Sequence, residues 1–320
     1  TESDRDFPLF LHPTPEVTPM TSTPASNSDQ IPVSSLAPFL VITFGIAWGI
    51  IALYIFLPTP MAAAFGEISG QHPLFYLATY APAIAALTII LTRCRWSETR
   101  RFLGRLLMWR TSTAWYAFLL LGVPLLFYIG ALWKGLPLSE MVPVSSIGGY
   151  LVALALSAIK GPVEEIGWRG LALPLLQRKM SPLWAGLALG VVWGLWHLPA
   201  FFLSGAPQSA WSFTDFFIGT IALSLIATAL FNASRGSILL QAVFHLQVIN
   251  PLWPDAQPYD TIPFVVAALA VVWFNRDAML RGTGAVTHVV PPLPAAEADA
   301  PVSDRRTHVP APGVSVPERG

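Results

Sequence analysis

The feature of this sequence that most limits its possible folds is a series of apolar runs, most of them close to 20 residues long. A helix of about 20 residues spans the hydrocarbon core of a bilayer, because each residue adds about 1.5 Å to its length. Only 11% of the residues are charged, whereas soluble domains carry about 25%. The sequence therefore predicts an all-α, polytopic protein of the cell membrane. We predict about eight transmembrane helices, at residues 36–57, 74–92, 114–133, 147–177, 182–204, 213–231, 236–252 and 261–275.

The basic residues indicate how such a bundle is oriented. All but three of the 18 Lys and Arg residues fall in the two terminal segments or in alternate connections between predicted spans, and six arginines crowd residues 93–110. Because Lys and Arg are enriched on the cytoplasmic side of membrane proteins, we predict that both termini are cytosolic. The connection 93–110 also carries aromatic and apolar residues. It is either an amphipathic helix that contacts membrane lipids or a plain cytosolic connection.

The two ends of the chain differ from this core in composition. Residues 1–35 are rich in Pro, Ser and Thr, and residues 282–320 are rich in Pro, Ala and Val, without helical periodicity. We predict disordered tails at 1–35 and 282–320, on either side of a transmembrane domain at 36–281. The formal net charge is zero, so no basic field favours a nucleic-acid partner and none is expected.

Two carboxylates and an arginine interrupt the fourth predicted span, in the stretch Gly161-Pro162-Val163-Glu164-Glu165-Ile166-Gly167-Trp168-Arg169-Gly170. Each ionisable group at membrane depth costs about 2.5–3.5 kcal/mol, so three of them within six residues indicate a functional requirement. On a helix, Glu165 and Arg169 lie on one face and can pair. Glu164 lies about 100° away and is left available. Pro162 predicts a break in this long span.

Two histidines, His197 and His245, fall inside later spans. Counted from the cytosolic flanks, Glu164, His197 and His245 are expected roughly 20, 22 and 14 Å deep, so three spans could bring them to one level. Such a group supports three chemistries. A buried glutamate can act as general base on water, two His and one Glu can bind zinc with a position left for water, and Glu and His can relay protons.

Small residues predict close packing of the fifth span. Gly186, Gly190 and Gly194 repeat every four residues and so lie on one helix face. Such a face allows a neighbouring helix to approach closely. His197, three residues past Gly194, is expected near the same face.

Three motifs resemble those of one family, the CAAX prenyl protease and bacteriocin-processing (CPBP, or Abi) family of intramembrane endopeptidases. They occur in order in this chain as Glu164-Glu165-x-x-x-Arg169, Trp193-x-x-x-His197, and Asn232-Ala233-Ser234-Arg235-Gly236-Ser237 leading to His245. The resemblance covers about residues 147–252, which we therefore expect to form the catalytic core.

The resemblance implies a role for each matching residue. Glu164 is expected to activate water, with Glu165 and Arg169 as supporting members. His197 is expected to help hold the water or a metal. His245 and an asparagine are expected to bind metal or to stabilise the oxyanion. If the enzyme uses zinc, its ligands would come from His197, His245 and Glu164.

The asparagine of this last motif is displaced by one residue in this chain. The family pattern has it four residues after the histidine, whereas here Asn250 follows His245 by five. A spacing of five residues puts Asn250 about 140° from the face of His245. Gln241, four residues before His245, is the alternative source of an amide at the oxyanion.

The resemblance implies an intramembrane endopeptidase acting on a membrane-anchored, prenylated or otherwise hydrophobic peptide. Two alternatives from other classes use the same residues. One is a proton-coupled transporter with Glu164 as the carrier, and the other is a non-catalytic membrane scaffold. The sequence does not choose between a zinc-dependent and a metal-free mechanism.

Overall fold

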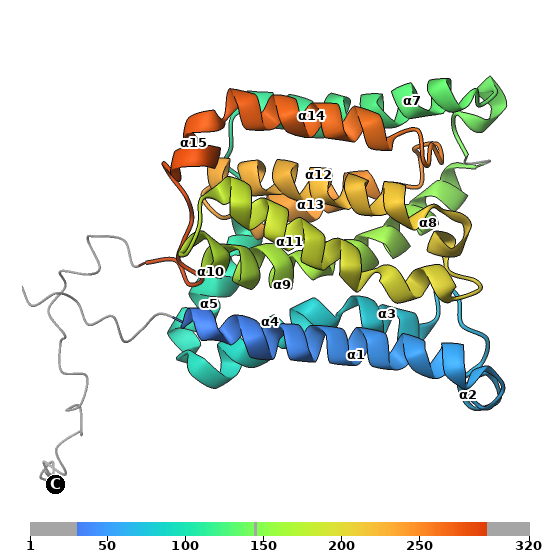
Figure 1. Cartoon of the computed structure of the whole chain (residues 1–320), viewed down its shortest axis with the longest axis horizontal. Coiled ribbons are helices and arrows are strands. Elements are labelled where there is room, and N and C mark those ends of the chain that lie inside the picture. The colour runs from blue at the N-terminus through green and yellow to red at the C-terminus, as the bar shows by residue number, and fades with distance from the viewer. Residues whose placement is uncertain (1–30, 144–145, 293–320) are drawn as a thin grey trace, which may run out of the picture. The chain divides into compact units, whose positions relative to one another are not determined.

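In a computed structural model of the chain, residues 31–143 and 146–292 are described, and within these ranges the protein is helical without β-strands. Figure 1 shows α11, α12 and α13 between α1, α3 and α4 on one side and α7 and α14 on the other. The helices in chain order are α1 (Leu36–Phe56), α2 (Pro58–Phe65), α3 (Pro73–Thr79), α4 (Ala81–Arg93), α5 (Trp96–Gly104), α6 (Thr113–Ala117), α7 (Val123–Lys134), α8 (Ile147–Lys160), α9 (Glu165–Gly167), α10 (Leu173–Gln177), α11 (Pro182–Trp196), α12 (Phe213–Ala233), α13 (Ile238–Val248), α14 (Thr261–Phe274) and α15 (Arg276–Arg281).

The described part of the chain has enough long apolar helices for several membrane crossings. Five segments have the length and composition of a membrane span: Val33–Phe56, Thr113–Lys134, Ile147–Gln177, Pro182–Phe202 and Phe213–Ala233. Helices α3 and α4 meet at a bend of 55° and make a sixth if they form one broken span, while α13 and α14 are shorter apolar helices. The prediction of an all-α, polytopic membrane protein is confirmed. The count of eight spans and the cytosolic termini stay predictions.

Helices α11 and α12 pack closely through the predicted glycine face. A Cβ atom added to Gly190 would lie 2.8 Å from the Cα of Ile221, and one added to Gly194 would lie 2.5 Å from the ring of Phe217. The Ser224 hydroxyl of α12 donates a hydrogen bond of 2.8 Å to the carbonyl of Gly186. Since real Cβ atoms do not come this close, only glycine allows the two backbones to approach as they do. This packing fixes the end of α11, where His197 lies.

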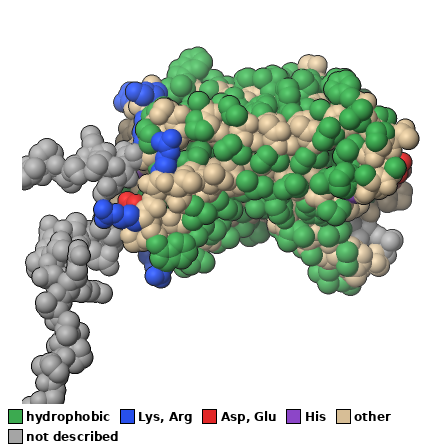
Figure 2. Space-filling view, turned by 90° about the horizontal axis from the view of Figure 1, so that it is seen from below, with side chains coloured by type: hydrophobic (Ala, Val, Ile, Leu, Met, Phe, Trp, Pro, Cys, Tyr) green, Lys and Arg blue, Asp and Glu red, His purple; other side chains and the backbone are tan. Residues whose placement is uncertain are grey.

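Basic side chains gather at one end of the helices. Figure 2 shows Lys and Arg at the left, where α5, α10 and α15 lie in Figure 1, while the long side of the molecule that faces the viewer is mostly hydrophobic. An apolar long side with basic residues gathered at one end is what the positive-inside rule leads one to expect for a membrane bundle.

Each predicted tail, 1–35 and 282–320, includes residues next to the transmembrane domain that the structure shows packed on its helices. At the N-terminal side, Ile31 is buried and the first span already starts at Val33. At the C-terminal side, residues 282–292 form a strap, here called the C-terminal strap, that packs on the bundle with Val289 buried. The remaining parts of the predicted tails, 1–30 and 293–320, lie outside the described residues.

The C-terminal strap is held mainly through its main-chain groups, which is why its composition did not reveal it. Arg105 donates to the carbonyl of His288 at 2.5 Å and to that of Gly236 at 2.9 Å. Burial lowers the pKa of Arg105 to about 10, so it stays charged at neutral pH. Further bonds join Arg178 to Thr287 (2.7 Å), Gln177 to Val286 (2.8 Å), Val286 to Asn232 (2.9 Å) and Arg101 to Pro291 (2.9 Å).

Truncating the chain after Arg281 is expected to destabilise it by roughly 2–4 kcal/mol, because partners of buried Arg105 and Gln177 are lost. Thermal unfolding in detergent measures this effect. Truncation after Pro292 is the matched control, since it keeps the whole C-terminal strap. Equal melting temperatures for the two truncations would show that the strap contributes nothing.

Candidate active site

The backbone breaks where the predicted ionisable stretch begins. Helix α8 ends at Lys160, whose φ of −94° and ψ of −85° depart from helical values. A 3-10 turn, Gly161–Glu164, follows, and the chain resumes through α9 and a π turn at Trp168–Ala172. Pro162 lacks an amide hydrogen and cannot continue the hydrogen bonding of α8, so the predicted break is confirmed. The irregular backbone places both glutamates inside the bundle.

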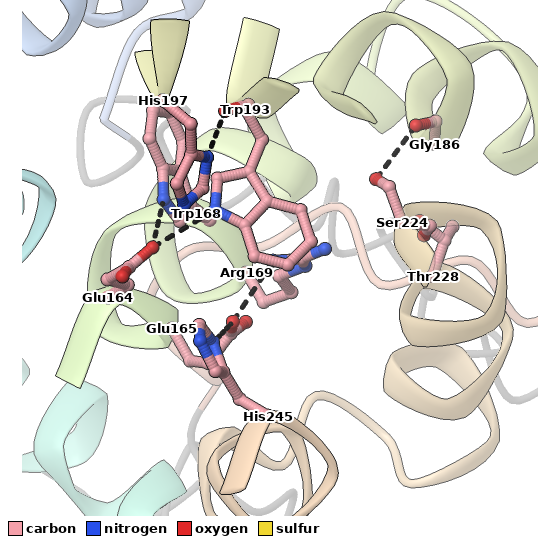
Figure 3. A network of polar contacts seen from close by, with 10 residues as sticks. All are labelled: Glu164, Glu165, Trp168, Arg169, Gly186, Trp193, His197, Ser224, Thr228 and His245. Atoms are coloured by element: carbon pink, nitrogen blue, oxygen red, sulfur yellow. Dashed lines mark hydrogen bonds and ion pairs between the residues drawn. The ribbon is translucent and has the colours of Figure 1, made fainter. Parts of the chain in front are cut away.

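Glu164 is 3% exposed and is held by two indole groups. Its Oε2 accepts hydrogen bonds from Nε1 of Trp193 at 3.0 Å and from Nε1 of Trp168 at 3.3 Å (Figure 3). Its Oε1 makes no hydrogen bond within the described residues. Because an indole only donates, these contacts fix the carboxylate without supplying a counter-charge. One carboxylate oxygen is therefore anchored while the other remains available for a water molecule.

Glu165 is the centre of a buried ion-pair network. Its Oε1 accepts from Nη1 of Arg169 at 3.1 Å, so the predicted pairing is confirmed. The same oxygen lies 2.7 Å from Nδ1 of His245, which is 80 residues away in the chain. Because the carboxylate accepts, Nδ1 of His245 carries the proton, and Nε2 is the ring atom left for other partners. The Arg169 guanidinium also lies over the ring of Trp193, 4.5 Å from its centroid.

His197 is oriented by its own helix. Its Nδ1 lies 2.8 Å from the carbonyl oxygen of Trp193, which can only accept, so Nδ1 carries the proton here as well. The rings of Trp193, Trp196 and Phe216 surround the imidazole at centroid distances of 5.7, 4.8 and 5.0 Å. As in His245, Nε2 is the nitrogen left for a water molecule or substrate.

A cavity of about 290 Å³ joins these groups. Glu164, His197 and His245 all line it, so the structure brings together the three ionisable groups predicted from separate spans. Apolar side chains of α1 and α3 form much of the opposite wall, among them Ile51 and Phe75. The arrangement can hold a water molecule beside a carboxylate and two oriented imidazoles, next to apolar surface.

The two candidate amides do not reach this cavity. Helix α13 ends at Val248, so Asn250 lies past its end; it donates to Gln247 at 3.1 Å and lines a neighbouring cavity instead. The predicted oxyanion role of Asn250 is therefore not supported by its position. Gln241 is fully buried against α12, where its amide can donate to Ala227 and accept from Phe231. Neither amide is placed to stabilise an oxyanion beside Glu164.

The expected zinc ligands do not form a metal site in this arrangement. Among the described residues, no group of three or more His, Cys, Asp or Glu side chains is close enough to hold a metal ion. As they lie in the described part of the chain, these side chains do not form a zinc site.

Three contributors to the site were not predicted as such. Trp168 and Trp193 donate hydrogen bonds to Glu164, a role that neither their aromatic character nor the motif Trp193-x-x-x-His197 indicated. Gly161 lines the cavity against His245, and a Cβ atom there would lie 2.6 Å from its Nε2. The only local sequence signal that could have identified Gly161 as part of the site is its position beside Pro162.

We expect Gly161→Ala to lower catalytic activity by at least tenfold, because the added methyl group would displace His245 or Ile249, each 2.6 Å from the new Cβ. The measurement is turnover of a cleaved peptide by protein whose melting temperature has been checked. Gly148→Ala, in the preceding helix α8, is the matched control, with no atom within 4 Å of the added Cβ. Unchanged turnover of Gly161→Ala would show that the position of His245 does not matter.

The fold and the site together define a multi-pass membrane protein that encloses an ionisable site between its helices. Residues 145–248 match the family model described as type II CAAX prenyl endopeptidase Rce1-like. The chain is 27% identical over 146 residues to CAAX prenyl protease 2 of Methanococcus maripaludis, an alignment that covers 42% of this chain and 54% of that protein. The chain thus spans about half the length of this curated relative. These matches support the resemblance to the CPBP family that the three motifs predicted.

Proposed function

We propose that this chain is an intramembrane endopeptidase that hydrolyses a peptide bond of a hydrophobic, lipidated or membrane-anchored peptide. The observation that supports this most directly is the convergence of Glu164, His197 and His245 on one cavity. The similarity to a CAAX prenyl protease supports the same reaction class. The apolar walls formed by α1 and α3 suit a substrate that arrives from the bilayer.

In this proposal Glu164 is the general base. Oε2 is held by the two indoles, so Oε1 is the oxygen that takes a proton from water. The water oxygen then bonds to the carbonyl carbon of the substrate. Nε2 of His197 accepts the second hydrogen bond of this water and so orients its attack. As the C–N bond breaks, Glu164 returns the proton to the leaving amine.

His245 is the group proposed to stabilise the oxyanion. Its Nδ1 donates to the Glu165 carboxylate, and in this proposal a proton on Nε2 donates to the developing negative charge. Arg169 shares Glu165 with His245 and keeps that carboxylate in place. This assignment replaces the amide of Asn250 or Gln241 by an imidazole, which fits the positions of all three side chains.

The proposal is tested with purified protein in nanodiscs and a peptide carrying a lipidated cysteine near its C-terminus. We expect cleavage at one bond, detected by mass spectrometry. Cleavage of no peptide, together with Glu164-dependent proton flux in liposomes, would support the transporter alternative. Absence of both activities, with an unchanged cellular phenotype for Glu164→Gln, would support a scaffold.

Metal content measured on the same preparation tests the zinc alternative. We expect cleavage to persist after chelator treatment, with no stoichiometric zinc. Zinc at one ion per chain, with activity lost on chelation and restored by zinc, would contradict the metal-free mechanism. It would require His197, His245 and Glu164 to move together on metal binding.

A further inference from the structure

A groove of about 560 Å³, here called the basic groove, lies between two connections that the proposed active site does not use. One connection, residues 107–112, leads from α5 to α6, and the other, residues 233–235, follows α12. The segments Thr113–Lys134 and Phe213–Ala233 both have the length and composition of a membrane span. The basic groove therefore lies where one span begins and another ends, at the level of the lipid head groups.

The charge that lines the basic groove is entirely positive. Arg110 and Arg235, one from each connection, line it and are exposed, and among the described residues no Asp or Glu does so. Neither guanidinium makes an ion pair within that part of the chain. Thr111 adds a buried hydroxyl that has no hydrogen-bond partner there. Because guanidinium groups present paired N–H donors, this set of side chains suits a phosphate group.

The backbone of Arg235 indicates that its side chain is needed at this position. Arg235 has a φ of 56°, and it is the only residue other than glycine with a positive φ in the described ranges. After the end of a helix this left-handed conformation is usually taken by glycine, because a Cβ atom disfavours it. The chain therefore keeps a guanidinium where its backbone alone would favour glycine.

Hydrogen bonds hold the facing connection in place. The hydroxyl of Ser237, the N-cap residue of α13, donates to the carbonyl of Met108. The hydroxyl of Tyr116 donates to the carbonyl of Trp109. These two contacts fix the backbone on the N-terminal side of Arg110, so both arginines extend from a defined main chain.

Apolar side chains accompany the arginines. Leu107 and Trp109 line the basic groove and are 79% and 60% exposed. At a membrane–water boundary such side chains contact lipid, and a small free anion would leave them unused. We propose that the basic groove binds an anionic phospholipid, with its phosphate held by Arg110 and Arg235 and its acyl chains against Leu107 and Trp109.

The test is native mass spectrometry of the full chain in neutral detergent, with phosphatidylglycerol or phosphatidylcholine of identical acyl chains. The variants are Arg235→Gly alone and Arg235→Gly with Arg110→Gln. Glycine adopts the left-handed conformation freely, so Arg235→Gly should melt at the same temperature or higher without lipid. The matched control is Arg276→Gln with Arg281→Gln, which removes two charges from exposed positions outside the basic groove.

We expect the unmodified chain to prefer phosphatidylglycerol by about tenfold, because phosphatidylcholine carries its own cation beside the phosphate. Arg235→Gly should lose most of this preference, the double variant all of it, and the control none. Equal binding of both lipids by the unmodified chain, an unchanged preference in the double variant, or an equal loss in the control would each overturn the inference. Displacement of the lipid by inorganic phosphate at equal concentration would also overturn it, since the ligand would then be a free anion.

Discussion

Glu164→Gln is expected to lower kcat by about 10²–10⁴-fold while the protein stays folded. The glutamine oxygen can still accept from Trp168 and Trp193, so the two contacts that hold the side chain are kept. The amide cannot take a proton from water, and the proposed base is lost. The measurement is the rate of peptide cleavage in nanodiscs, with melting temperature as the check on folding.

The matched control for this change is Glu140→Gln, because Glu140 is exposed in the connection that precedes α8. It removes the same charge without touching the site and should leave kcat unchanged. If Glu164→Gln kept full activity in a folded protein, Glu164 would not be the base and the proposed mechanism would be wrong. A loss of activity accompanied by unfolding would indicate a structural role instead.

Arg169→Met is expected to destabilise the protein by about 3–5 kcal/mol, since it leaves the buried carboxylate of Glu165 without its guanidinium. The Arg169 and Glu165 side chains are 1% and 2% exposed, so water cannot replace the lost partner. The stacking of the guanidinium on Trp193 is lost as well. Unfolding measured by heat or denaturant in detergent gives the size of the effect.

The chain offers a matched control for this variant in Arg281→Met. Arg281 pairs with Asp277 at the same spacing of four residues, but these side chains are 79% and 67% exposed. Its loss should cost at most about 1 kcal/mol. Adding Glu165→Gln to Arg169→Met should recover part of the stability, because the unpaired charge disappears. A similar small effect at both arginines would show that burial does not strengthen the inner pair.

The sequence by itself determined the features that depend on neighbours along the chain. The apolar runs predicted an all-α membrane protein because the backbone polar groups of a spanning segment must be satisfied within it. The spacing of four between Glu165 and Arg169 predicted their ion pair, and Pro162 predicted the break after α8. The glycine repeat predicted the close packing of α11, because helical period alone decides which residues share a face.

Only the tertiary structure decided how distant segments meet. His245 lies on Glu165 although 80 residues separate them, and no local pattern encodes that contact. Asn250 turns away from the site because α13 ends at Val248, two residues earlier. The C-terminal strap binds through main-chain carbonyls. Every residue has a main-chain carbonyl, so the composition of the segment does not reveal these contacts. Periodicity fixes which face of a helix a residue occupies, but the rotation and depth of each helix follow from side-chain packing with its neighbours, and these set the distances at which chemistry occurs.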